Sequence, residues 1–195
     1  MTGASHPKHT IRRDARARRI AAAKAAPRTV RAMFARQFLG VIPVKAGAVV
    51  AGYAAMGAEA DPQAILRALL KRGHAIALPV IHAAEKPLSF RVWHPNAHHV
   101  TGAHGIKAPH GSARTLVPDI LIVPLVAFDR AGHRLGQGGG FYDRTLKSLR
   151  RRKRVIAVGL AYAAQEVPSL AAEAHDEPLD WIVTEREAIC VRRKR

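Results

Sequence analysis

The sequence predicts an α/β domain in which helices flank a largely parallel central sheet in three layers. Apolar runs typical of strands alternate with helical segments along most of the 195 residues, an order typical of parallel sheets. The run over residues 120–126 is almost entirely apolar, as expected for a strand covered on both faces. Hydrophobic residues make up 48% of the chain, too many for a disordered protein. We therefore expect one domain over residues 1–195, with a basic helical arm over about residues 1–26 and a basic tail over about residues 190–195.

The N-terminal region is expected to contain two helices before the first strand. Residues 6–26 form a basic, Ala-rich helical stretch. A second helix is expected to begin near Pro27, because proline suits the first turn of a helix. The short apolar run over residues 48–54 has strand character.

A strand–helix–strand order continues the chain. Asp61 and Pro62 form a helix start, apolar residues then recur on one helical face, and Gly73 stands where a C-terminal cap belongs. Two strands are expected next, over residues 75–81 and 88–93, joined by a polar turn.

The C-terminal half begins with a segment rich in His, Gly and Pro, residues 94–118, which lacks periodicity and is expected to be a long loop. The elements expected after it are a strand over 120–126, a helix over about 141–150, a strand over 155–160, a helix-prone stretch around Leu170 and a final strand over 181–183.

Composition argues against several classes of protein. The only cysteine is Cys190, so neither an intramolecular disulfide nor a cysteine zinc site can form, and a reducing cytoplasm suits the chain. No apolar run approaches the roughly 20 residues of a membrane span, so no membrane partner is expected. Lys and Arg (32) outnumber Asp and Glu (14), and the net charge of +18 favours anionic partners such as nucleotides, polyanionic cofactors or nucleic acid.

A glycine cluster separates the 120–126 strand from the following helix. Five of the nine residues from 132 to 140 are glycine. A strand end, a glycine cluster and a helix start place backbone N–H groups around an anion, and phosphate is the natural ligand, although glycine clusters also form plain turns. The pattern is neither a Walker A loop, which needs a following Lys, nor G-x-G-x-x-G, because Phe141 occupies the last position. Asp143 in the first helical turn could hold Mg²⁺ or could merely complement the helix dipole.

The run from Arg134 through Gly140, Phe141, Tyr142 and Asp143 resembles the signature of the 5-formyltetrahydrofolate cyclo-ligases, also called 5,10-methenyltetrahydrofolate synthetases. Phe141 replaces the first tyrosine of that signature. The resemblance extends from Lys8 to Thr184, and the matching segments include Lys8-x-x-Ile11-Arg12, Tyr53 to Asp61, Leu78-Pro79-Val80, Pro87 to Arg91, Gly105-Ile106 with Pro109, Val158 to Tyr162 with Gln165, and His175-Asp176 with Pro178-Leu179-Asp180.

The resemblance implies a fold like that of the NagB, RpiA and CoA-transferase enzymes. It also implies ATP-dependent conversion of 5-formyltetrahydrofolate to 5,10-methenyltetrahydrofolate, with release of ADP and phosphate. In this reaction the formyl oxygen attacks the γ-phosphate, and N10 then closes the ring. Because an amide oxygen carries no proton, the step needs alignment and charge neutralisation more than a base.

The same resemblance assigns residues to three subsites, with no catalytic acid or base. The ATP residues are Lys8, Arg12, Arg134, Gly136, Gln137, Gly138, Gly139, Gly140, Phe141 and Tyr142. The folate residues are Ala54, Glu59, His104 and Tyr142, and the Mg²⁺ ligands are Asp143 and Asp176. The alternatives from the residues alone are a solvated basic arm for Lys8 and Arg12, a polar loop residue for Glu59, and core packing for Tyr142.

Three other functions compete with this interpretation. His94-x-x-x-His98-His99 has the spacing of a metal pair, but it lacks a neighbouring Glu and lies in an apparent loop, which disfavours zinc. The charge suggests a nucleic-acid-binding protein, yet aromatic residues make up only 5% and no basic–aromatic motif is present. An enzyme of the same fold acting on CoA esters or sugar phosphates would have no evident use for Lys8. We expect a cytoplasmic monomer whose partners are ATP and 5-formyltetrahydrofolate, with or without a polyglutamate tail, and not nucleic acid.

Overall fold

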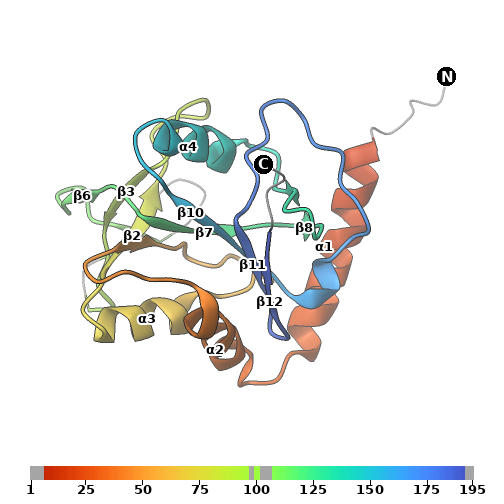
Figure 1. Cartoon of the computed structure of the whole chain (residues 1–195), viewed down its shortest axis with the longest axis horizontal. Helices are drawn as coiled ribbons and strands as arrows, with labels where there is room; N and C mark the ends of the chain where they lie inside the picture. Colours follow the sequence, from red (N-terminus) through yellow and green to blue (C-terminus); the bar gives the residue numbers. More distant parts are fainter. Residues whose placement is uncertain (1–6, 97–98, 102–106, 192–195) are drawn as a thin grey trace.

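Eight strands form the central sheet in the computed structural model, which describes residues 7–96, 99–101 and 107–191 (Figure 1). The adjacent parallel strands are β11 (Trp181–Val183), β10 (Ile156–Leu160), β7 (Ile120–Pro124), β1 (Val49–Ala51) and β2 (Ala75–Val80). Both edges are antiparallel, and their strands are β12 (Ala188–Cys190) beside β11, then β3 (Ser89–Val92) and β6 (Thr115–Leu116) beyond β2. This topology confirms the expected α/β class with a largely parallel sheet.

Helices cover both faces of this sheet and give three layers (Figure 1). α2 (Val30–Val41) and α3 (Gln63–Lys71) lie on one face, and α4 (Phe141–Arg150) lies on the other. α1 (Pro7–Ala25) stands at the end of the sheet. Among the described residues, no helix has the length and apolar character needed to cross a membrane.

The alternation of side chains along β7 explains why the sheet is covered on both faces. Ile120 and Ile122 are buried in the core formed with α2 and α3, whereas Leu121 and Val123 are buried in the core formed with α4. Successive side chains of a strand point to opposite faces, so an unbroken apolar run requires two cores.

Local capping sets the limits of α3 as the sequence predicts. The Asp61 carboxylate accepts a hydrogen bond from the backbone N–H of Gln63 at 2.9 Å, and this satisfies a donor that the first helical turn leaves unpaired. After the helix, Gly73 adopts a φ of 83°, a conformation that costs glycine nothing. The face buried against the sheet carries Ile65, Leu66 and Leu69.

A short hairpin, β8 (Ala127–Phe128) and β9 (Arg134–Leu135), leads from the sheet to α4. Its turn is organised by Asp129, which is 2% exposed. The Asp129 carboxylate accepts hydrogen bonds from the backbone N–H groups of Ala131, His133 and Leu170. α1 packs beside this hairpin, because its fully buried Ala15 belongs to a cluster with Val126, Ala127, Leu135 and Leu170.

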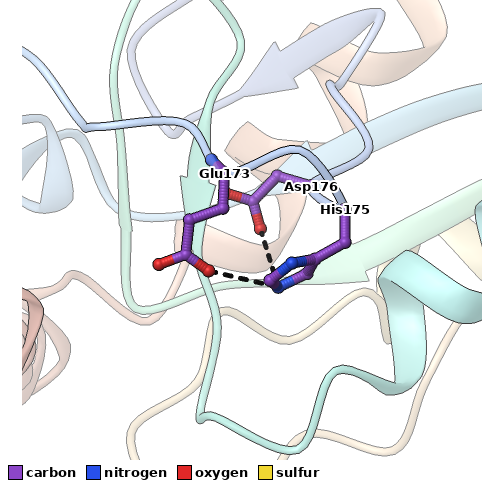
Figure 2. Close-up of side chains that lie close together, drawn as sticks. All are labelled: Glu173, His175 and Asp176. Carbon is purple, nitrogen blue, oxygen red and sulfur yellow. Dashed lines mark hydrogen bonds and ion pairs between the residues drawn. The ribbon is translucent and has the colours of Figure 1, made fainter.

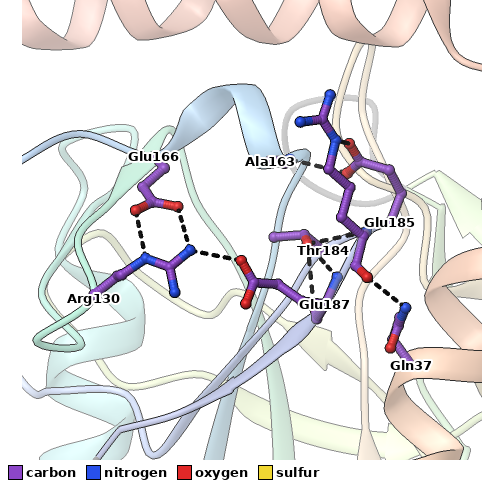
Figure 3. A network of polar contacts seen from close by, with 8 residues as sticks. Gln37, Arg130, Ala163, Glu166, Thr184, Glu185 and Glu187 are labelled. Carbon is purple, nitrogen blue, oxygen red and sulfur yellow. Dashed lines mark hydrogen bonds and ion pairs between the residues drawn. The ribbon is translucent and has the colours of Figure 1, made fainter.

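A network of polar contacts fastens the turn between β11 and β12 to its neighbours (Figure 3). Arg130 donates to Glu166 (Nε to Oε1, 2.8 Å) and to Glu187 (Nη2 to Oε1, 2.6 Å). Gln37 of α2 donates to the Arg186 carbonyl oxygen at 2.7 Å. These contacts are exposed and each contributes little to stability, but they join the edge of the sheet to α2 and to the hairpin turn that carries Arg130.

Several sequence-based expectations differ from the structure. The predicted loop over 94–118 contains the short strands β4 (His99–Thr101), β5 (Lys107–Pro109) and β6. The prediction of helical structure around Leu170 is wrong, because that segment is irregular. The nearest helix is the 3₁₀ turn Ala163–Gln165. Residues 181–183 are not the last strand, because β12 follows. Of the basic tail over about 190–195, residues 192–195 lie outside the described part of the chain.

Replacing Phe34 by Ala should lower the free energy of unfolding by about 3–5 kcal/mol, because it empties a large site in the core. Phe34 is fully buried and meets the Tyr162 ring edge to face, with ring centres 5.5 Å apart. Chemical denaturation measures the change. Val41→Ala, at a 46% exposed position of the same helix, should stay within about 0.5 kcal/mol, and equal losses in the two variants would contradict the assignment of Phe34 to the core.

Candidate functional site

The glycine loop over residues 136–140 connects β9 to the N-terminus of α4, and two of its glycines have backbones that other residues rarely adopt. Gly138 has a φ of 113° and Gly140 a φ of 62°. Close packing restricts the loop further: a Cβ on Gly139 would lie 2.9 Å from the Phe141 ring, and one on Gly140 would lie 2.6 Å from Arg144 Nη1. The loop therefore keeps its backbone exposed at the positive end of a helix, which is a suitable place for an anion.

A cleft of about 360 Å³ opens beside this loop. Two cationic side chains of α4, Arg144 and Lys147, line it and could contact phosphate, and two acidic side chains, Glu85 and Asp143, line it as well. Arg144 also holds the loop, because its Nη2 donates to the carbonyl oxygens of Gly139 and Ala84, each at 2.6 Å. The other lining residues are Gly138, Gly139, Gly140, Phe141, His175 and Ala84.

α1 is fastened onto the glycine loop by two arginines. Arg12 Nε donates to the Gly136 carbonyl oxygen at 3.0 Å, and Arg16 Nη2 donates to Gln137 Oε1 at 2.7 Å. The structure thus brings Arg12 to the loop, as the sequence predicts, and adds Arg16, which follows it by one helical turn. Lys8 lies in the first turn of α1, but its side chain lies outside the part of the chain that the structure describes.

Asp143 and Arg134 form an ion pair at the start of α4. Arg134 Nη2 lies 2.5 Å from Asp143 Oδ1, and the backbone N–H of Glu177 donates to the same oxygen at 3.1 Å. Arg134 Nη1 donates to the Glu177 carbonyl oxygen. Burial lowers the pKa of Arg134, and the charges of Asp143 and Asp176 oppose this shift. Arg134 therefore already pairs with Asp143, while the family resemblance also assigns it to the ATP subsite beside the loop.

Asp176, the other predicted metal ligand, belongs to an exposed group with Glu173 and His175 (Figure 2). His175 Nε2 lies 3.2 Å from Glu173 Oε2 and 3.9 Å from Asp176 Oδ1. The potential ligand atoms of these three residues lie within 4.8 Å of one another, and Asp143 is not part of this group. Burial lowers the pKa of Arg134, and the charges of both aspartates nevertheless act to raise it.

A second cluster forms around Glu59, in the segment between β1 and α3. Glu59 Oε2 accepts a hydrogen bond from the backbone N–H of Met56 at 3.0 Å. Burial and the charge of Glu59 raise the pKa of Tyr142, while Arg134 lowers it. Burial also raises the pKa of Tyr53 well above its ordinary range, and Glu59 adds to this shift. Tyr142 therefore lies within electrostatic reach of both Glu59 and Arg134.

The remaining predicted folate residues are less informative. Ala54 is partly buried and directly follows Tyr53, whose hydroxyl donates to the Ala60 carbonyl oxygen at 2.5 Å. His104 lies outside the described residues, as does His98 of the alternative zinc motif.

Sequence reasoning missed three arginines of the site: Arg16, Arg19 and Arg144. Arg19 Nη1 lies 3.8 Å from Glu59 Oε1, and both side chains are about 10% exposed. The spacing of Arg12, Arg16 and Arg19 on one helical face was a usable signal. Arg144 directly follows the signature, but its contacts with Gly139 and Ala84 depend on the folded loop.

Comparison with known proteins gives one consistent result. A sequence model of the 5-formyltetrahydrofolate cyclo-ligase family matches residues 4–185. The 5-formyltetrahydrofolate cyclo-ligase of Escherichia coli K12 is 39% identical over 147 residues, which are 73% of this chain and 80% of that protein. The enzyme of the same name from Haemophilus influenzae is 38% identical over 146 residues, 72% of this chain and 78% of that protein.

Solved structures agree with the sequence comparison. The NMR structure of 5,10-methenyltetrahydrofolate synthetase from Aquifex aeolicus superposes with a TM-score of 0.80 at 29% identity, over 97% of this chain and 95% of that one. The synthetase from Mycoplasma pneumoniae gives a TM-score of 0.69 at 20% identity, over 92% and 99%, and this likeness concerns the fold.

Gly140→Ala should destabilise the protein by about 1–2 kcal/mol, because alanine is strained in the left-handed conformation and Arg144 must also move. Gly40→Ala is the matched control, since a Cβ at that helical position meets nothing within 4 Å. It should instead stabilise the protein by about 0.5–1 kcal/mol. Thermal or chemical denaturation compares the two, and a neutral Gly140→Ala would show that the loop backbone is not fixed as described.

Proposed function

Because the chain belongs to the 5-formyltetrahydrofolate cyclo-ligase family, we propose that it converts 5-formyltetrahydrofolate and ATP to 5,10-methenyltetrahydrofolate, ADP and phosphate. The observation that carries the proposal is the junction of two half-sites in the first turn of α4. Tyr142 lies within electrostatic reach of Glu59, and the next residue, Asp143, pairs with Arg134 beside the glycine loop. A nucleotide at the loop and a folate at Glu59 would thus meet at one helix terminus.

The chemistry requires the two substrates to be aligned. The formyl oxygen attacks the γ-phosphorus, the bond from that phosphorus to the bridging oxygen breaks, and ADP leaves. N10 then attacks the activated carbon, the carbon–oxygen bond breaks, phosphate departs with the formyl oxygen, and N10 gives up its proton. Charge on the transferred phosphoryl group is the main difficulty, and fixed donors relieve it best.

The chain's own residues fit these needs. The backbone of Gly138, Gly139 and Gly140 and the α4 N-terminus would hold phosphate oxygens, with Arg12 and Arg144 supplying positive charge at the loop. Glu59 would accept hydrogen bonds from the N–H groups of the pterin ring. Tyr142, whose pKa is raised, stays protonated at neutral pH and can donate a hydrogen bond at the boundary between the two ligands.

Asp143 is the residue we propose as a ligand of Mg²⁺. Its Oδ1 accepts both hydrogen bonds from Arg134 and Glu177, and its Oδ2 accepts none from residues 7–96, 99–101 and 107–191. Mg²⁺ usually takes one or two carboxylates plus substrate phosphates, so one fixed carboxylate oxygen beside a phosphate cleft fits that ion. The ion would neutralise charge on the γ-phosphate. Asp176 would contribute the second carboxylate, and its charge, like that of Asp143, acts on Arg134.

We further propose that the enzyme acts as a cytoplasmic monomer and accepts folates with a polyglutamate tail. The single cysteine, Cys190, supports a reducing compartment. The excess of basic over acidic residues supports the attraction of a polyanionic tail.

The direct test is the near-ultraviolet absorbance of the methenyl product, followed after 5-formyltetrahydrofolate is added to the protein with ATP and Mg²⁺. One ADP and one phosphate should form per product, and omission of ATP should abolish the signal. Folded protein that yields no product would overturn the proposal. If nucleic acid were the partner instead, the chain would bind it tightly, with an affinity that falls steeply as salt rises.

Asp143→Asn should lower kcat by about 100-fold or more and raise the Mg²⁺ concentration needed for half-maximal rate, because an amide is a much weaker ligand for the ion. Asparagine keeps an oxygen for Arg134 and the Glu177 N–H, so the fold should survive. Initial rates across a Mg²⁺ titration measure the effect. Asp14→Asn, an exposed carboxylate on α1, serves as the control, and an unchanged Mg²⁺ dependence in Asp143→Asn would refute the assignment.

A further inference from the structure

Arg19 is a buried arginine of α1 with an unusual lack of hydrogen-bond partners. The residue is 8% exposed, and its Nε and Nη1 atoms are buried without any acceptor among the described residues. A buried charged donor without an acceptor is costly, so such a group in a folded protein calls for a specific explanation.

The only acidic side chain in an ion pair with Arg19 within the described chain is Glu59. The gap between Arg19 Nη1 and Glu59 Oε1 is 3.8 Å, too long for a hydrogen bond and close enough for a strong electrostatic attraction. Glu59 Oε2 already accepts the Met56 N–H, so its Oε1 is the atom that faces the guanidinium. Tyr53 and Tyr142 lie within electrostatic reach of Glu59, because its charge adds to the burial that raises the pKa of each tyrosine.

We propose that Arg19 is a positioning residue that acts through Glu59, and that the gap between their side chains closes to a hydrogen bond when a folate-type ligand occupies the site. This inference rests on the function proposed above. Arg19 fixes the direction in which the Glu59 carboxylate presents its oxygens to the N–H groups of the ligand. The buried guanidinium need not touch the ligand itself.

The geometry of α1 explains how Arg19 is placed relative to the glycine loop. Arg12 and Arg19 are seven residues apart, which is nearly two full turns, so both lie on the same face of α1. Arg12 is fixed to the Gly136 carbonyl oxygen at one end of this face, and Arg19 faces Glu59 at the other. α1 therefore relates the position of Glu59 to that of the glycine loop, and the two subsites share one rigid support.

The experiment compares Arg19→Met with Arg18→Met, a neighbouring exposed arginine whose loss changes the net charge equally. Arg19→Met should raise the KM for 5-formyltetrahydrofolate by about tenfold or more, as expected when an orienting charged hydrogen bond is lost. The KM for ATP should change less than about twofold, a split that general loosening of the fold would not produce. Arg18→Met should leave both constants unchanged, and Arg19→Lys should recover part of the loss.

A double-mutant cycle with Glu59→Gln separates action through Glu59 from an independent role. The combined variant Arg19→Met with Glu59→Gln should bind the folate about as weakly as Glu59→Gln alone. Additive effects, or an equal rise of both KM values, would overturn the inference about Arg19 while leaving the proposed function intact. Wild-type protein without cyclo-ligase activity would overturn both. If Arg19→Met does not fold, a wild-type folate KM in Arg19→Lys would count against the inference.

Discussion

The ion pair between Arg134 and Asp143 is the interaction on which the site depends. It joins β9 to the first turn of α4, and the backbone of Glu177 bonds to both side chains, so three segments distant in sequence are held at one point. The Arg134 side chain is only 5% exposed, so removing the Asp143 side chain altogether would leave a buried guanidinium without its acceptor there. The glycine loop lies between the two paired residues and is therefore held at both ends.

The fold was largely predictable because its main signals are local. The α4 helix begins at Phe141 as expected, since the glycine run cannot continue a helix and the apolar positions that follow have helical spacing. The error around Leu170 has a tertiary cause. The Leu170 N–H is bonded to the buried Asp129 carboxylate, and its side chain packs near Ala15 of α1, contacts that propensity cannot anticipate. β12 was missed because a three-residue strand exists only through its pairing with β11.

The candidate site was predictable in part for the same reason. The glycine loop and Asp143 lie between a strand end and a helix start, where local backbone geometry decides what they face. Arg12 was supplied by the family resemblance, because its partner, the Gly136 carbonyl oxygen, lies far along the chain. Arg19 and Arg144 gain their roles from partners far along the chain, at Glu59 and Ala84, and no local pattern reports such a pairing. The family resemblance identified Glu59 as a candidate site residue, but it did not identify Arg19, whose guanidinium lies 3.8 Å from the Glu59 carboxylate.

Two helices, α4 and α1, carry residues of both proposed half-sites. α4 presents Tyr142 and Asp143 as consecutive residues, so a shift of its N-terminus would move both half-sites together. α1 instead spans the half-sites with residues two turns apart, and it is fastened by side-chain contacts to the loop. Because phosphoryl transfer between two bound substrates depends on their relative position, a rigid element across both sites is worth more than stronger binding at either one. The basic helix α1 is thus better explained as an element that fixes the relative position of the two proposed half-sites than as a solvated arm.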